Sequence, residues 1–259
     1  MVKTDATKSP PPPAAAKTVR PPQAPRPLVH LVDTADFSVD MLPGRGKSAI
    51  VAFAGIGLVG MQPQEFRRSL SGQSRTLFFV RDKRGQWYNG IDAAIIAALN
   101  AEISSRGITQ VSGLGNSMGG FAGLAMAGRI TNCDRVLAFS PQTAMRPDLV
   151  PFERRWASMR ANITHWTLPD CVPLLRPGIA YVVLVGGRGT ADIAHIDRLT
   201  KSHASVDIRV IPDVEHNVAK TLRPGGGLRR LINAVITTGI LPDDPTHPLL
   251  RYADWRRSV

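Results

Sequence analysis

The chain has little cysteine and no long apolar run, and each absence argues against a class of protein. Only Cys133 and Cys171 occur in 259 residues, and neither stands in a CxxC motif or a Cys/His cluster. A disulfide framework and a metal site are therefore not indicated, and we expect no metal or cofactor. No stretch approaches the roughly 18 apolar residues of a membrane span, and no apolar run follows the charged N-terminus. We expect a cytoplasmic protein without a membrane span.

Acidic side chains are outnumbered by basic ones, 20 to 32, which gives a formal net charge of +12. Such a charge can indicate a nucleic-acid partner, but the basic residues are scattered and form no run interleaved with aromatic side chains. Aromatic residues make up only 6% of the chain. We therefore expect no nucleic-acid partner, and the oligomeric state stays open.

One domain is enough to account for the length and composition. A chain of 259 residues that is 43% hydrophobic can bury one substantial core. Residues 1–27 are rich in proline and nearly lack large apolar side chains, which predicts a disordered basic tail. The folded domain is expected over residues 28–259, with a small cap where the pattern loosens between 143 and 177.

Short strand-like segments alternate with helix-compatible segments. The apolar runs 49–54 and 181–185 are typical of strands buried on both faces. Further strands are expected at 28–33, 37–39, 76–80, 108–111, 135–139 and 206–211, helices at 91–106 and 228–236, and a surface segment around Trp255. The alternation predicts an α/β fold, a mostly parallel central sheet with helices on both faces in a three-layer sandwich.

A serine stands at the apex of one tight strand-to-helix turn. Residues 115–119 read GNSMG, which fits the G-x-S-x-G nucleophile elbow. In such a turn the serine adopts a strained backbone conformation above the sheet, and glycines two positions away let the strand and helix pass closely. Ser117 is therefore the candidate nucleophile.

Two further polar residues follow strands in the order that a catalytic triad needs. A serine hydroxyl needs a general base, and the base needs an acceptor on its other nitrogen. Asp192 follows the strand at 181–185, and His216 follows the strand at 206–211. Asp192 has an alternative role as a cap of the following helix, and Asp148 is then the fallback acid.

The glycine-rich segment after the strand at 49–54 allows two interpretations. Gly55, Gly57 and Gly60 spell G-x-G-x-x-G, and Asp82 follows about 20 residues later, as in a dinucleotide fingerprint. The same glycines suit a loop whose backbone N–H groups form half of an oxyanion hole. Pro63 would interrupt the helix that a fingerprint requires, which favours the oxyanion loop.

Residues 81–90 form a polar loop with two aromatic side chains. In a parallel sheet this loop lies at the carboxyl edge beside the elbow, where ligands bind. Trp87 and Tyr88 are therefore candidate substrate contacts together with Gly57, although packing over the start of the next helix is an equal alternative for the two aromatic residues.

These segments resemble the α/β-hydrolases from about residue 49 to the closing helix. The resemblance rests on the elbow, on residues 187–192, which resemble the acid loop, and on residues 215–217, which resemble the histidine loop. It implies a serine hydrolase that cleaves an ester through an acyl-enzyme, with Ser117, His216 and Asp192 as the triad. Its oxyanion donors would be the N–H groups of Met118 and Ile56.

A second likeness is to hydrolase-like proteins linked to bacterial surface-polysaccharide biosynthesis. It rests on residues 78–90 and 140–142 and implies an ester of an acylated sugar as the substrate. Together the two likenesses imply a small-molecule or glycan ester as the partner of this chain. Two other functions stay open, namely a binding protein on a hydrolase fold and an NAD(P)-dependent oxidoreductase that uses the Gly55–Gly60 loop.

Overall fold

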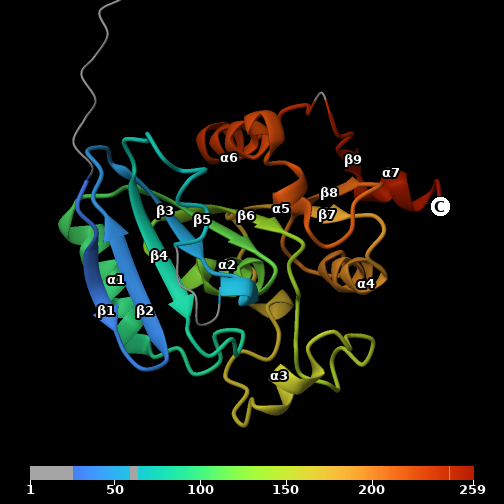
Figure 1. Cartoon of the computed structure of the whole chain (residues 1–259), viewed down its shortest axis with the longest axis horizontal. Coiled ribbons are helices and arrows are strands. Elements are labelled where there is room, and N and C mark those ends of the chain that lie inside the picture. The colour runs from blue at the N-terminus through green and yellow to red at the C-terminus, as the bar shows by residue number, and fades with distance from the viewer. Residues whose placement is uncertain (1–25, 59–63, 245) are drawn as a thin grey trace, which may run out of the picture.

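The computed structural model describes residues 26–58, 64–244 and 246–259 (Figure 1). Within them, strands in the order β1-β2-β4-β3-β5-β6-β7-β8-β9 form one sheet. Their bounds are β1 Val29–Asp33, β2 Phe37–Leu42, β3 Ser48–Phe53, β4 Thr76–Asp82, β5 Gln110–Asn116, β6 Cys133–Phe139, β7 Ala180–Gly186, β8 Val206–Ile211 and β9 Leu250–Arg251. The strands from β4 to β8 in this order run parallel, while β1, β2 and β9 pair antiparallel at the two edges.

The central strands are apolar throughout because both of their faces are covered. In β3, Ile50 and Ala52 pack into one hydrophobic cluster, while Val51 and Phe53 pack into another on the opposite face. Successive side chains of a strand point to opposite faces, so a strand buried on both sides shows no polar alternation. The predicted fold class is confirmed: a mostly parallel sheet lies between two layers of helices.

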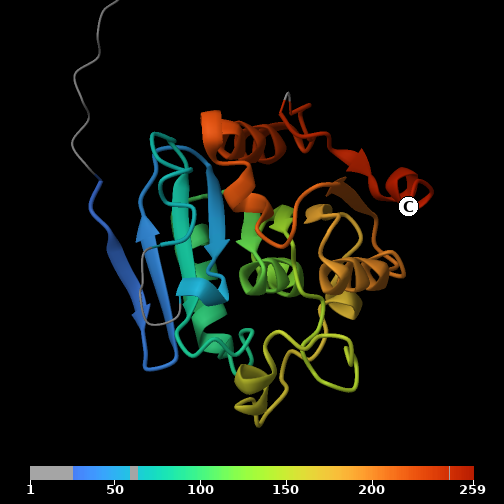
Figure 2. The same ribbon diagram turned by 45° about the vertical axis from the view of Figure 1, so that its right-hand side comes forward.

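The helices divide between these two faces (Figure 2). Apolar residues of α1, α2, α4 and α7 belong to one cluster, and those of α5 and α6 belong to the other. The bounds are α1 Ala93–Ser105, α2 Met118–Met126, α3 Ala157–Ala161, α4 Thr190–Leu199, α5 Val218–Thr221, α6 Gly227–Thr238 and α7 Tyr252–Arg256, with the 3-10 turns η1 Ile56–Leu58, η2 Ala127–Arg129, η3 Val172–Leu174 and η4 Pro224–Gly226.

Residues 143–177 are called the cap segment below. The part around α3 lies beyond the carboxyl ends of the parallel strands, at the bottom of Figure 1, while η3 returns along α2 and Arg176 lies beside Gly128. The segment contains α3 and η3 and is closed by one isolated bridge between Ala144 and Asp170. It is therefore mostly irregular, which explains why no hydrophobic period shows in its sequence.

Two termini differ from the sequence-based expectation. Arg26, assigned above to the tail, donates hydrogen bonds from Nη1 to the carbonyl oxygens of Pro43 (2.9 Å) and Arg75 (3.0 Å), so the ordered domain reaches at least to this residue. The rest of the predicted tail, residues 1–25, lies outside the described residues. The expected surface segment at the other end is wrong for Trp255, which α7 buries against the core.

In the described part of the chain, no helix is long and apolar enough to cross a membrane. The two cysteines are free thiols, Cys171 buried and Cys133 partly buried.

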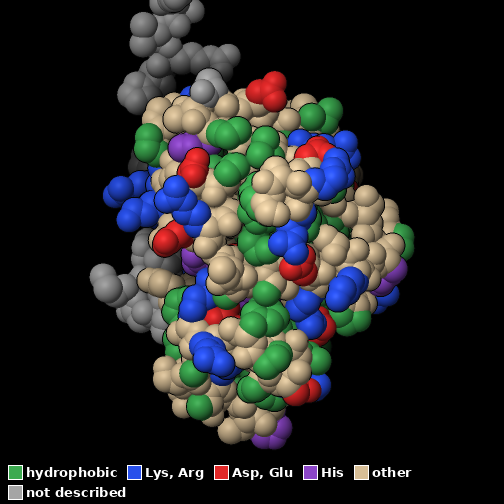
Figure 3. Space-filling model, turned by 90° about the vertical axis from the view of Figure 1, so that its right-hand side faces the viewer, with side chains coloured by type: hydrophobic (Ala, Val, Ile, Leu, Met, Phe, Trp, Pro, Cys, Tyr) green, Lys and Arg blue, Asp and Glu red, His purple; other side chains and the backbone are tan. Residues whose placement is uncertain are grey.

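The basic side chains are scattered over the surface in view. Figure 3 shows Lys and Arg side chains dispersed over the face that carries β9 and α7, with acidic and apolar side chains between them.

Candidate active site

Ser117 occupies the turn between β5 and α2 and has a strained backbone. Its φ of 56° and ψ of −119° lie in a region that side-chain-bearing residues rarely adopt. The turn is held on both sides, because the Ser117 N–H donates to the Phe139 carbonyl (2.8 Å) and the Ser117 carbonyl accepts from the Phe121 N–H (3.0 Å). The predicted elbow geometry is thus present around this serine.

His216 brings its ring to the serine from the end of β8. Its Nε2 lies 2.9 Å from Ser117 Oγ, and its Nδ1 lies 2.9 Å and 3.0 Å from the two carboxylate oxygens of Asp192. Since a carboxylate only accepts, Nδ1 carries the proton and Nε2 is left to accept from the serine hydroxyl. The carboxyl ends of β5, β7 and β8 lie at the same edge of the sheet, which is why three distant residues meet.

Asp192 lies in the first turn of α4 rather than in a loop before a helix. The N-cap of α4 is Gly189, and no side chain caps this helix end, so the alternative capping role does not describe what the carboxylate does. The carboxylate is buried and contacts His216 and Arg155. Asp148, the fallback acid, is exposed and paired with Arg146 at 2.7 Å.

Gln142 is a site residue that the sequence did not single out. Its Nε2 donates to Ser117 Oγ (2.9 Å), and its Oε1 accepts from the Trp87 indole N–H (3.2 Å). The indole fixes which end of the amide faces the serine, because an N–H can only be matched by the amide oxygen. The sequence signals were its place three residues after the end of β6, at the same sheet edge, and its presence in residues 140–142, on which the second likeness rests.

The two aromatic candidates are fully buried. Trp87 reaches the site only through Gln142, and the Tyr88 hydroxyl lies 3.0 Å from the Ala54 carbonyl and 3.1 Å from that of Val80. Burial, with the charges of Asp82 and Glu65, holds the pKa of Tyr88 well above its usual value. Both side chains are packed in the core, in agreement with the packing alternative. A direct contact of Trp87 or Tyr88 with a substrate stays a prediction.

Asp82 is engaged by its own loop. Its carboxylate accepts backbone N–H groups from Arg84, Gly85, Gln86 and Tyr88, and it is buried. Burial raises the pKa of Asp82, against the lowering effect of these four donors. A dinucleotide fingerprint needs this carboxylate for a ribose hydroxyl, so the oxidoreductase alternative loses its acidic residue.

The loop after β3 carries the other oxyanion candidate. Ile56 begins η1, Gly57 is exposed, and Met118 begins α2, where the first backbone N–H groups of a helix have no partner within it. Gly60, in the second half of the proposed motif, lies outside the described residues. Glu65, which the sequence did not single out, accepts the Gly55 N–H and so ties down this loop.

Glu65 makes stability depend on pH. Burial raises the pKa of Glu65 to about 7, against the smaller lowering effects of the Gly55 N–H and the charge of Arg223. A folded-state pKa above the unfolded value of 4.5 means that the contribution of Glu65 to stability is greatest below about pH 4.5 and is lost as pH rises through 7. The loss is at most about 3 kcal/mol, and less because the side chain is partly exposed.

Glu65→Gln keeps an acceptor for Gly55 but cannot titrate. Its free energy of unfolding in urea is therefore expected to exceed that of the wild type at pH 8 and to match it at pH 4.5, with a difference of about 1–3 kcal/mol. Asp213→Asn, which removes an exposed carboxylate, is the control and should show no such divergence. Parallel pH curves for Glu65→Gln and wild type would show that the Glu65 carboxyl titrates normally.

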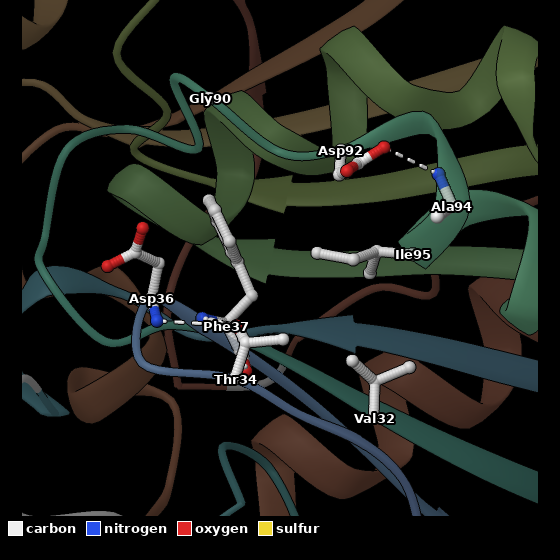
Figure 4. Close-up of a pocket in the computed structure, with 8 residues that line it drawn as sticks. All are labelled: Val32, Thr34, Asp36, Phe37, Gly90, Asp92, Ala94 and Ile95. Carbon is white, nitrogen blue, oxygen red and sulfur yellow. Dashed lines mark hydrogen bonds between the residues drawn. The ribbon is translucent and has the colours of Figure 1, made fainter.

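A pocket of about 340 Å³ lies away from these residues, where the β1–β2 turn meets the start of α1 (Figure 4). Its polar groups already serve the turn and the helix end: Thr34 Oγ1 accepts the N–H groups of Asp36 (3.3 Å) and Phe37 (3.0 Å), and Asp92 caps α1 through the Ala94 N–H (2.8 Å). No cluster of three or more metal-ligating side chains occurs in the described ranges. The polar groups of this pocket are thus already engaged, and Ser117 remains the candidate site.

No family model matches the chain, and no curated protein sequence does. Solved structures do match. A thermophilic esterase from the Planctomycetes species Thermogutta terrifontis, with propionate bound, superposes with a TM-score of 0.59 at 15% identity over 85% of this chain and 97% of the esterase. The same esterase phosphoramylated by tabun gives a TM-score of 0.61 at 14% identity, over 86% of this chain and 98% of that chain.

The capsule O-acetyltransferase of Neisseria meningitidis serogroup A is also similar, with a TM-score of 0.60 at 12% identity over 80% of this chain and 93% of the transferase. At these identities the likeness is one of fold, and the fold is the α/β-hydrolase fold expected from the sequence.

Proposed function

We propose that the protein is a serine hydrolase that cleaves a carboxylic ester through an acyl-enzyme intermediate. The observation that carries this proposal is the unbroken hydrogen-bond chain from Ser117 Oγ through both ring nitrogens of His216 to the buried carboxylate of Asp192. A serine alone is a poor nucleophile at neutral pH, and this chain is the arrangement that activates it.

In the first half-reaction Ser117 Oγ attacks the ester carbonyl, and its proton moves to His216 Nε2. The imidazolium then carries two N–H groups, and the one at Nδ1 is already directed at Asp192. His216 returns the proton to the leaving alcohol as the C–O bond breaks. In the second half-reaction water attacks the acyl-enzyme by the same route, which releases the acid and restores Ser117.

The oxyanion would be held by the backbone N–H groups of Met118 and Ile56. Met118 starts α2, so its N–H points out of the helix N-terminus, where negative charge is stabilised. Each such donor contributes about 10²–10³-fold to the rate in characterised enzymes. Glu65 supports this arrangement indirectly, because it holds the preceding residue, Gly55.

A second candidate function is acyl transfer to an alcohol, favoured by the likeness to the capsule O-acetyltransferase. The chemistry is the same up to the acyl-enzyme, and a sugar hydroxyl then replaces water. An acylated sugar is consistent with either direction of this reaction. Product analysis after incubation with an activated acetyl ester and a sugar acceptor distinguishes the two, because transfer yields an acetylated sugar and hydrolysis yields acetate alone.

A fluorophosphonate probe tests the proposal at the residue. The probe is expected to label the protein once, and peptide mass spectrometry is expected to find it on Ser117. Ser117→Ala should remove both the label and the turnover of a p-nitrophenyl ester, while Ser104→Ala, on the exposed surface of α1, should change neither. A folded protein that takes up no label would instead support the binding-protein alternative, and quenching of protein fluorescence by NADH would revive the oxidoreductase.

A further inference from the structure

An arginine from the cap segment contacts the acid of the proposed triad. Arg155 stands just before α3, and its Nη1 lies 2.8 Å from Asp192 Oδ1. The same nitrogen lies 3.4 Å from His216 Nδ1. Asp192 therefore has two partners, His216 on one side and a permanent cation on the other. An unmatched cation in that place would oppose the positive charge that His216 gains when it takes the serine proton.

Glu153 supplies the matching negative charge. Its carboxylate is fully buried and accepts from Arg155 Nε at 3.0 Å and from Nη2 at 2.5 Å, a two-pronged pair of the kind that fixes a guanidinium plane. Burial by itself would raise the pKa of Glu153, but the hydrogen bonds from His195 and Arg155 hold it well below its usual range. These contacts favour the ionised form of Glu153.

His195 holds Glu153 without adding a charge. Its Nδ1 accepts the Thr143 N–H at 3.1 Å, so its proton is on Nε2, which lies 3.2 Å from Glu153 Oε2. The ring is completely buried, and this burial lowers the pKa of His195 against the opposing effect of Glu153. A neutral His195 leaves Arg155 as the single countercharge of Glu153 within this cluster.

We propose that Arg155 is a positioning residue for Asp192, and that Glu153 neutralises it so that the negative charge of Asp192 remains for the His216 imidazolium. This inference rests on the proposed function, since it assigns Asp192 and His216 their triad roles. The three charges add to minus one, which the imidazolium balances when the proton is transferred. Arg155 meanwhile holds Asp192 Oδ1 and prevents the carboxylate from turning away from the ring.

Substitutions that remove the charges of Arg155 and Glu153 are therefore expected to have non-additive effects on kcat. Arg155→Gln removes one charge-assisted hydrogen bond to Asp192, and kcat is expected to fall roughly 10- to 100-fold. Glu153→Gln leaves the arginine unmatched beside the imidazolium, and the loss is expected to be at least as large. The double variant Glu153→Gln/Arg155→Gln removes both charges, so its kcat is expected to exceed that of Glu153→Gln alone.

The experiment measures kcat and KM of the full chain for a p-nitrophenyl ester at one pH. Arg155→Gln is expected to change kcat and leave KM within about twofold, because a residue that acts through Asp192 alters the chemical step rather than substrate binding. Arg155→Lys should recover part of kcat, since an ammonium reaches one partner but cannot bridge both. Arg154→Gln is the matched control. The Arg154 side chain, next to Arg155 in the sequence, is exposed and makes no hydrogen bond or ion pair with the described residues, so the kcat of this variant should equal that of the wild type.

Thermal melts of the same proteins separate a positioning role of Arg155 and Glu153 from a purely structural one. A purely structural role would lower the melting temperature of the double variant at least as much as that of Glu153→Gln, and the double variant would not regain kcat. The inference is overturned if Arg155→Gln retains wild-type kcat, or if the double variant is no faster than Glu153→Gln. Loss of turnover in Ser117→Ala alongside either result would leave the proposed function standing, whereas full turnover in Ser117→Ala would remove the proposed function itself.

Discussion

Asp192→Asn is expected to lower kcat for ester hydrolysis by about 10⁴-fold, through the wrong tautomer of His216. Arg155 decides which way the new amide turns, because its guanidinium donates to Oδ1 and would hold the single amide oxygen. The amide NH₂ group then faces His216 Nδ1 and forces that nitrogen to accept. The ring proton moves to Nε2, which then donates to the Ser117 hydroxyl instead of accepting from it.

Two measurements check this expectation. Steady-state hydrolysis of a p-nitrophenyl ester gives kcat, and the rate of fluorophosphonate labelling gives the reactivity of Ser117 independently of deacylation. Asp148→Asn is the matched control, because it removes the exposed fallback acid by the same substitution, and its kcat should equal that of the wild type. Loss of activity in Asp148→Asn, with activity retained in Asp192→Asn, would move the acid of the proposed triad to the segment after β6.

The parts of the site that the sequence predicts are those fixed by local geometry and by sheet topology. A glycine-flanked serine between an apolar strand and a helix has few conformations open to it, so the turn at Ser117 follows from residues 115–119 together with the strand before them and the helix after them. Asp192 and His216 each follow a buried strand of a parallel sheet, and the carboxyl ends of such strands converge. Predicting that Asp192 and His216 lie close together therefore required only the correct fold class, which the apolar runs of β3 and β7 indicate.

The residues that the sequence missed lie where no periodicity guides the chain. Glu153 and Arg155 belong to the mostly irregular cap segment, whose path across the sheet edge depends on tertiary packing. Gln142 carries no motif, and its contact with Ser117 depends on how the chain leaves β6. Glu65 acts through a single backbone N–H, a contact that residue type cannot reveal.

Backbone conformation explains the uncertainty about the two aromatic residues. Trp87 and Tyr88 have φ values of 51° and 59°, and residues with side chains rarely adopt this region. The four N–H contacts to the Asp82 carboxylate hold the loop in this form and turn both rings into the core. Placement at the sheet edge was predictable, whereas the direction of the rings depends on the hydrogen bonds of the Asp82 carboxylate to its own loop, which residue type does not reveal.

Gly119→Ala is expected to destabilise the protein by about 3 kcal/mol, although alanine is the better helix former. A Cβ at this position would lie 2.1 Å from the Phe53 carbonyl oxygen of β3, and a backbone oxygen cannot rotate away as a side chain would. The helix or the strand must therefore shift. For a chain of this size the melting temperature should fall by roughly 6–12 °C.

The control for Gly119→Ala is Gly123→Ala, one turn later in α2. A Cβ there would lie 3.3 Å from a methyl group of Val136, which can yield by a few tenths of an ångström, and the helix propensity of alanine offsets that strain. Its melting temperature should stay within about 3 °C of the wild type. Because α2 carries the Met118 N–H and follows Ser117 directly, Gly119→Ala should also lower the rate of fluorophosphonate labelling at a temperature where it is fully folded. Equal melting temperatures for the two alanine variants would mean that α2 does not pass β3 as closely as the elbow requires.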